Sequence, residues 1–242
     1  MKILVVGCSY TYGSGCDDRA WYFDDKTQKW IPERPNFPLP GPSKFGWATL
    51  LQNALPEHEV INLAMPGHDN SRMFNDAVSR KDIDNVDLII FAGTSENRMR
   101  VAEPIQIGNN ATTSWVLSNM GIRGSDEYKK AQEYFIKHLY HPSIQTDTSV
   151  LAIHAIDALA NRINAKLLWH LQFWDTGFND PRLNRLRNNQ FKSIIEFIKY
   201  NKSNDGTLNP EYLSPCFHAN NRGHQEYFDE YLLPLVKQTL NI

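Results

Sequence analysis

The sequence has 242 residues, of which 25 are Lys or Arg and 27 are Asp or Glu, so its formal net charge is −2. A near-neutral chain without a basic run is not typical of a non-specific nucleic-acid-binding protein. No stretch approaches the ~18 consecutive apolar residues of a membrane-spanning helix. We therefore expect one domain over residues 1–242, with neither nucleic acid nor a membrane as partner.

The three cysteines, Cys8, Cys16 and Cys216, are too few and odd in number for a disulfide framework, which favours a reducing compartment. Cys8 follows an apolar run in the manner of a lipoprotein cleavage site, but that run covers only Ile3 to Val6, whereas a signal peptide needs ~7–15 apolar residues. We therefore expect a cytoplasmic protein whose first apolar run is a strand. The cysteines and histidines show no CxxC or HxxxH spacing, so we expect no metal and no cofactor.

Apolar runs alternate with helical patterns along the chain, which is typical of a parallel sheet with helices on both faces. In chain order, the predicted strands are 2–7, 60–64, 86–92 and 166–173. The predicted helices are 46–55, a stretch from 71, 126–139, a stretch from Asp147 or Thr148 to 163, 191–200, and a stretch from about 221 that is bent or ended at Pro234. Two segments, a proline-rich one at about 14–45 and another at about 94–145, are predicted to be loop insertions. We expect an α/β domain whose mostly parallel sheet has about five strands.

In such a sheet the ligand site lies beyond the carboxyl ends of the strands, and polar blocks follow three of these ends. The blocks are Gly7-Cys8-Ser9-Tyr10-Thr11, then Asn62 to Asn70, and then Gly93-Thr94-Ser95-Glu96-Asn97. A fourth block, His218 to His224, opens the last predicted helix. A serine at a tight strand-to-helix turn lies near backbone N–H groups that can receive an oxyanion, and a distant histidine can accept its proton. The pattern therefore indicates acyl transfer.

These blocks resemble, in order, those of the SGNH (GDSL-like) hydrolase family, which is named for its Ser, Gly, Asn and His blocks. The resemblance spans most of the chain, from Gly7 to the helix after His218, with Cys8 where Asp is commonest in the family. It implies a flavodoxin-like three-layer α/β/α sandwich and an esterase, lipase or carbohydrate-deacetylase activity without a metal. It also implies that Ser9 is the nucleophile, that His218 is the base, and that the N–H groups of Ser9 and Gly67 contribute to the oxyanion hole.

The third block departs from the family pattern. It reads Gly93-Thr94-Ser95-Glu96 where the family has Gly-x-Asn-Asp, and Asn97 comes two places late. The side chain that completes the oxyanion hole is therefore either Ser95, through its hydroxyl, or Asn97, through its amide.

The second departure concerns the acid of the catalytic triad. The family places it three residues before the histidine, and that position is Pro215 in this chain. A Ser9–His218 dyad would still work if a backbone carbonyl held the imidazole N–H. Glu211 and Asp205 are the upstream alternatives for the acid, although no spacing selects them.

Several of these residues also have a purely structural interpretation. Gly67 after Pro66 suits a turn with positive φ, and Asn70 suits the cap of the next helix. Cys8 is a weaker nucleophile candidate, because alternation along an extended chain points it away from Ser9. Gly13-Ser14-Gly15 lacks the third glycine of a dinucleotide site.

The sequence thus favours a serine esterase that acts on a small-molecule or carbohydrate ester, such as an O-acetyl group. Pro215 and the altered third block keep open a non-catalytic binding or structural protein with the same fold. An acyltransferase that passes the acyl group from Ser9 to another alcohol is a further alternative.

Overall fold

A computed structural model of the chain describes residues 1–17, 21–24, 29–32, 41–94, 98–102, 112–116, 130, 134, 137, 142–172 and 180–242. Its centre is a parallel sheet of four strands in the order β4-β1-β5-β8. The strands are β1 (Lys2–Gly7), β4 (Glu59–Asn62), β5 (Leu88–Gly93) and β8 (Lys166–Leu171). β5 is buried along its whole length, as expected for a continuous apolar run in a parallel sheet covered on both faces.

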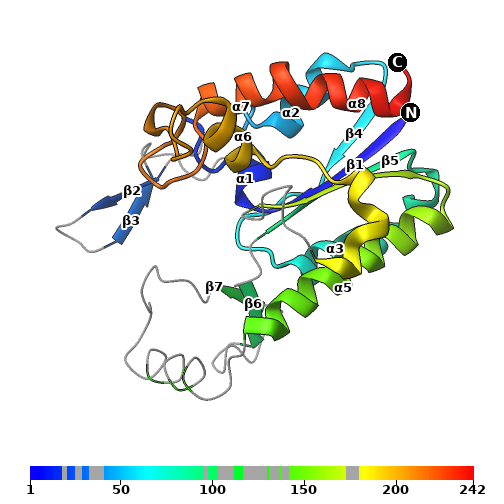
Figure 1. Ribbon diagram of the computed structural model, residues 1–242, viewed down its shortest axis with the longest axis horizontal. Coiled ribbons are helices and arrows are strands. Elements are labelled where there is room, and N and C mark those ends of the chain that lie inside the picture. Colours follow the sequence, from blue (N-terminus) through cyan, green and yellow to red (C-terminus); the bar gives the residue numbers. More distant parts are fainter. Residues whose placement is uncertain are drawn as a thin grey trace.

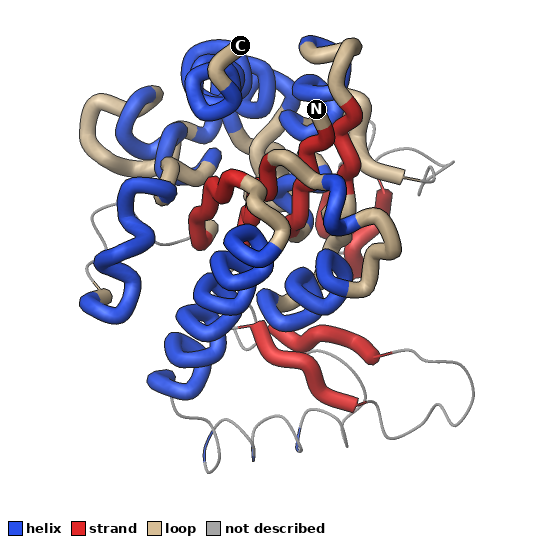
Figure 2. Tube along the Cα trace, turned by 90° about the vertical axis from the view of Figure 1, so that its right-hand side faces the viewer, coloured by secondary structure: helices blue, strands red, loops and turns tan. Residues whose placement is uncertain are grey.

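Helices cover both faces of this sheet, which confirms the predicted three-layer α/β/α architecture (Figure 1). On one side lie α2 (Trp47–Ala54), α6 (Ile194–Asn201), α7 (Asn221–Tyr227) and α8 (Leu233–Leu240). On the other side, α3 (Asn70–Val78) and α5 (Pro142–Arg162) pack against each other beneath the strands (Figure 2). Short helical segments complete the described chain: α1 (Ser9–Tyr12), η1 (Ile83–Asn85), η2 (Pro181–Asn189), η3 (Pro210–Tyr212) and η4 (Phe228–Leu232).

The expected fifth strand is reduced to a single bridge in the described part of the chain. Gln190 pairs in parallel with Trp169 of β8, and Phe191 N–H donates to the Trp169 carbonyl at 3.0 Å. The pairing stops there because the Ser193 side chain caps α6, which begins at the next residue. The prediction of about five strands was therefore one too high.

The start of α5 and the effect of Pro234 differ from the predictions. α5 begins at Pro142 and not at Asp147 or Thr148, since proline suits the first turn of a helix. Pro234 does not end the last helix, because the π-helical turn η4 precedes it and connects α7 directly to α8. The helix expected over 126–139 lies mainly outside the described residues.

The two segments predicted to be loops each contain an antiparallel pair of strands. β2 (Trp21–Asp24) pairs with β3 (Lys29–Pro32), and β6 (Arg98–Ala102) pairs with β7 (Thr112–Val116). Aromatic and β-branched residues are frequent in these strands, and they favour extended chain. Among the residues that the structure describes, no helix has the length and apolar character needed to cross a membrane.

Two buried histidines are expected to make the stability of this fold depend on pH. Burial lowers the pKa of His170 to about 3, and burial together with the nearby His218 lowers the pKa of His224 to about 3. Between about pH 6.5 and pH 3 the unfolded chain therefore binds protons that the folded chain does not, so stability is full above this range and falls as the pH is lowered through it.

We expect the free energy of unfolding in urea to fall by roughly 2 kcal/mol for each histidine between about pH 6.5 and pH 5. The variant His170→Gln should show about half of this pH dependence, because one of the two groups is removed. Equal stability at both pH values in the unmodified protein would contradict the prediction.

Candidate active site

Ser9 stands at the tight turn between the first strand and the first helix. β1 ends at Gly7, Cys8 is extended, and Ser9 is the first residue of α1. Ser9 is only 5% exposed, and its Oγ lies 2.8 Å from Nε2 of His218. The structure thus brings together the two residues that the sequence singled out, although they are far apart in the chain.

His218 is presented by a short antiparallel hairpin over residues 212–220, which we call the histidine hairpin. Asn220 N–H donates to the Tyr212 carbonyl at 2.9 Å. At the next rung the His218 carbonyl accepts from the N–H of Ser214 at 2.8 Å and from its hydroxyl at 3.1 Å. Two hydrogen bonds to the His218 carbonyl, together with the neighbouring Tyr212–Asn220 rung, therefore fix the backbone that carries the His218 side chain.

A backbone carbonyl contacts the second ring nitrogen of His218. Nδ1 of His218 lies 3.1 Å from the carbonyl oxygen of Cys216, immediately after Pro215. Because a carbonyl can only accept a hydrogen bond, Nδ1 must carry the proton in this contact. Nε2 of the neutral ring is then free to accept the proton of the Ser9 hydroxyl.

Two residues to which the sequence analysis gave no role lie beside His218. The Tyr10 ring lies against it, with ring centroids 4.4 Å apart, and the Tyr10 hydroxyl donates to the Phe217 carbonyl at 3.4 Å. Phe217 itself has a φ of +60° and is 63% exposed. No spacing in the sequence could have indicated either contact.

The glycines after Ser9 have a structural role that the sequence analysis did not recognise. Gly13 ends α1 in the left-handed conformation, with a φ of +82°. Gly15 lies against the histidine hairpin, where an added Cβ would come within 2.4 Å of the Ala219 carbonyl oxygen and 2.6 Å of the His218 Cβ. The sequence feature that could have indicated this role is the presence of two glycines just after a candidate nucleophile.

The backbone at the predicted oxyanion hole has free donors. The β4 chain continues along β1 until Met65 N–H donates to the Gly7 carbonyl at 3.1 Å, so the following turn lies at the same sheet edge as Ser9. Gly67 has a φ of +83° in this turn, as a glycine after Pro66 was expected to have. Within the described chain, the N–H groups of Ser9 and Gly67 donate no hydrogen bond.

The side chain that would complete the oxyanion hole stays a prediction, because Ser95 and Asn97 both lie outside the described residues. Asn70 is not the cap of α3 as expected, since Asp69 holds that position and accepts from Arg72 N–H. The Asn70 amide instead accepts from Thr94 N–H at 2.7 Å. It therefore fastens the end of β5 to α3.

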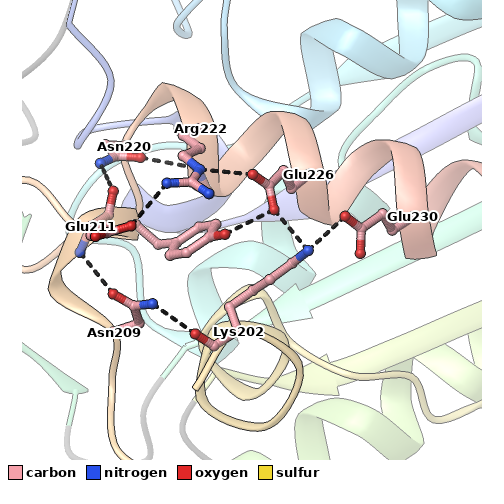
Figure 3. Close-up of polar contacts among 9 residues, drawn as sticks. Lys202, Asn209, Glu211, Asn220, Arg222, Glu226 and Glu230 are labelled. Atoms are coloured by element: carbon pink, nitrogen blue, oxygen red, sulfur yellow. Dashed lines mark hydrogen bonds and ion pairs between the residues drawn. The ribbon is translucent and has the colours of Figure 1, made fainter. Parts of the chain in front are cut away.

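Neither upstream acid contacts His218. Figure 3 shows Glu211 turned toward Arg222, whose guanidinium lies 3.0 Å from the carboxylate. Asp205 accepts from Ser203 and Thr207, and these hydrogen bonds lower the pKa of its carboxyl group to about 2. Both carboxylates thus have other partners.

The base of the histidine hairpin is tied to the helices by a polar network (Figure 3). Glu226 of α7 accepts from the Arg222 guanidinium at 2.8 Å, the Lys202 ammonium at 2.7 Å and the Tyr212 hydroxyl at 3.0 Å. Asn220 caps α7 and also donates to the Glu211 carbonyl at 2.8 Å. Because Tyr212 and Asn220 form the first rung of the hairpin, this network anchors the element that carries His218.

We expect the variants Glu211→Gln and Asp205→Asn to keep kcat/KM for an aryl acetate within about threefold of the unmodified protein, because exposed ion pairs contribute little. A hidden triad acid would instead give a loss of about 10³–10⁴-fold when it is converted to its amide. Steady-state kinetics of the two variants decide between these results. A loss of kcat/KM of that size in either variant would identify the substituted residue as a triad acid.

All three cysteines are free thiols. Cys8 is fully buried in the core, so it is not accessible as a nucleophile. Burial raises the pKa of the Cys216 thiol, but His218 and Ser214 outweigh it and lower that pKa to about 7. Among the described residues, no three His, Cys, Asp or Glu side chains gather as a metal site.

Comparison with known proteins bears on the fold. No family model and no curated protein matches the sequence. The structure is similar to that of a protein assigned to the lipolytic G-D-S-L family from Desulfitobacterium hafniense DCB-2, with 13% identity, 97% of this chain and 98% of that chain covered, and a TM-score of 0.51. It is also similar to TesA, with 10% identity, 99% of both chains covered and a TM-score of 0.52. The chain therefore has the fold of the SGNH (GDSL-like) hydrolases, as its sequence blocks predicted.

Proposed function

We propose that this chain, with its SGNH hydrolase fold, is a serine esterase that hydrolyses a carboxylic ester. The observation that supports the proposal best is the 2.8 Å contact between Ser9 Oγ and His218 Nε2 at the carboxyl edge of the sheet. A serine hydroxyl bonded to an imidazole, with the other ring nitrogen held by an acceptor, is the arrangement of an activated nucleophile.

In the proposed reaction, Ser9 Oγ attacks the ester carbonyl and its proton passes to His218 Nε2. The tetrahedral intermediate then expels the alcohol, which takes the proton from Nε2, and the acyl group stays on Ser9. A water molecule, deprotonated by His218, attacks the acyl-enzyme and releases the acid, and the proton returns to Ser9. Each step needs only Ser9, His218, the ester and water.

The oxyanion of each tetrahedral intermediate would be received by the N–H groups of Ser9 and Gly67. Their lack of other partners within the described chain supports this role. Removal of a single donor from such a site costs about 10²–10³-fold in kcat in other serine hydrolases. Asn97 or Ser95 would supply a third donor.

The Cys216 carbonyl holds His218 in the tautomer that the reaction needs. In serine proteases, replacing the triad Asp by Asn lowers turnover by about 10⁴-fold, chiefly because the imidazole adopts the wrong tautomer. A carbonyl acceptor avoids that defect, but it carries no full negative charge to stabilise the imidazolium. We therefore propose that Ser9 and His218 form a working dyad. As the substrate we propose an ester of a small acyl group, such as acetyl on a carbohydrate.

A fluorophosphonate probe tests the proposal, because it reacts only with an activated serine. We expect the purified protein to be labelled at Ser9, as read by peptide mass spectrometry, and to release acetate from acetylated sugars. Acyl transfer to an added alcohol in preference to water would make the protein an acyltransferase. Absence of labelling at high probe concentration would reject the esterase in favour of a binding or structural protein.

A further inference from the structure

The tip of the histidine hairpin has the usual geometry of such loops but an unusual residue in it. Ser214 and His218 close a loop over residues 215–217, in which Phe217 N–H donates to the Ser214 carbonyl at 2.9 Å. Loops of this kind consist of a turn followed by one residue in the left-handed conformation, which is most often glycine. Phe217 holds this position here, with a φ of +60°.

Burial does not explain a phenylalanine at this position, because its side chain is 63% exposed. The other non-glycine residues with positive φ in the described chain are Asn164 and Asn241, and asparagine tolerates this conformation. A bulky residue in the left-handed region is strained, and strain of this kind is concentrated at functional sites.

The φ angle of Phe217 helps to set the direction of the preceding peptide plane, and therefore of the Cys216 carbonyl. This carbonyl is the group that meets His218 Nδ1 at 3.1 Å. On the far side of the turn, the Phe217 carbonyl accepts from the Tyr10 hydroxyl at 3.4 Å. Phe217 thus lies between the carbonyl that contacts His218 Nδ1 and the carbonyl that holds Tyr10, whose ring lies against the imidazole.

We propose that Phe217 is a positioning residue whose left-handed backbone aims the Cys216 carbonyl at Nδ1 and so selects the tautomer of His218 that accepts the Ser9 proton. The inference rests on the proposed esterase function for its kinetic consequence. The tautomer of His218 itself can be measured whether or not the protein turns over a substrate.

A series of variants separates the backbone of Phe217 from its ring. Glycine adopts the left-handed conformation freely, asparagine tolerates it, alanine disfavours it and the β-branched valine disfavours it most. We expect Phe217→Gly and Phe217→Asn to keep a kcat near that of the unmodified protein. Phe217→Val should lower kcat by about tenfold relative to Phe217→Gly, whereas Phe217→Ala, which is no more strained than the native phenylalanine, should keep a kcat near that of the unmodified protein. Loss of the ring is common to all four variants, so a contact between ring and substrate would change KM in all of them.

The tautomer is read without substrate by nitrogen-15 NMR of the histidine side chains, with His218 assigned by its absence in His218→Asn. We expect protonated Nδ1 in the unmodified protein and in Phe217→Gly, and a mixture of tautomers in Phe217→Val. If the protein has no esterase activity but shows this series, only the proposed function fails. If it is an active esterase whose tautomer is the same in all variants, only the positioning role fails.

Asn164→Val is the matched control, because it places the same strain between α5 and β8, at the opposite end of the sheet from Ser9. It should lower the melting temperature and leave kcat and the His218 spectrum unchanged. Equal kcat in the glycine and valine variants, or an equal loss of kcat in all four, would overturn the proposal. Should Phe217→Val fail to fold, Phe217→Thr, which is also β-branched, takes its place in the comparison with Phe217→Gly.

Discussion

Ser9→Ala is expected to abolish labelling by a fluorophosphonate and to lower kcat/KM for an aryl acetate by about 10³-fold or more, with the fold intact. The reason is that the hydroxyl is the only group of Ser9 that would form the acyl-enzyme, while the oxyanion donors are backbone N–H groups that the substitution keeps. The free energy of unfolding should fall by only about 1 kcal/mol, the usual net contribution of one hydrogen bond such as that between Ser9 and His218.

Ser203→Ala is the control for this experiment, because its hydroxyl contacts Asp205 and not the candidate site. It should label and turn over like the unmodified protein. Activity in Ser9→Ala at the level of the unmodified protein would place the nucleophile elsewhere. The thiol of Cys216 would then be the next group to test, since Cys8 is buried.

The sequence was informative where a feature depends on local pattern. The buried strands β1 and β5 are continuous apolar runs, and a parallel sheet requires polar blocks at its carboxyl edge to converge. Strand convergence brings Ser9 to this edge, whereas His218 follows no strand, and its pairing with Ser9 was predicted from the resemblance of its block to the SGNH pattern; the contact spans most of the chain. The strand pairs β2–β3 and β6–β7 were not predicted, because the prolines and polar clusters around them indicate loop.

The orientation of His218 depends on features that residue types do not encode. An acid at the Pro215 position would have been visible in the sequence, whereas any residue has a carbonyl, and the direction of the Cys216 carbonyl depends on the backbone conformation of the turn, which residue types do not show. Glu211 and Asp205 were plausible as acids by composition. Their partners Arg222, Ser203 and Thr207 are supplied by the fold of the loop and by α7.

The second large effect is expected from Gly15→Ala, which removes no catalytic group. An added Cβ would lie 2.4 Å from the Ala219 carbonyl oxygen and 2.6 Å from the His218 Cβ, and contacts this short cannot persist. The neighbours are backbone and the first side-chain carbon, which cannot rotate away as the end of a long side chain would. Either the histidine hairpin or the chain around Gly15 must shift.

The hairpin is held at its base by the Glu226 network, whereas Ala219 and His218, which lie between the base and the tip, have the closest contacts with Gly15. We therefore expect His218 to move away from Ser9, and a displacement of about 1 Å is enough to lower kcat by about 10²-fold. The rate of fluorophosphonate labelling and kcat for an aryl acetate should fall together, while circular dichroism stays unchanged.

Gly206→Ala separates this steric effect from the general effect of replacing a glycine. Gly206 has a φ of +73° and open space around the position of a Cβ, so alanine there introduces backbone strain without a clash. It should lower the melting temperature and leave the labelling rate unchanged, whereas Gly15→Ala should lower the labelling rate. A normal labelling rate in Gly15→Ala would mean that the chain around Gly15 yields instead, and that the position of His218 is set by its own hairpin alone.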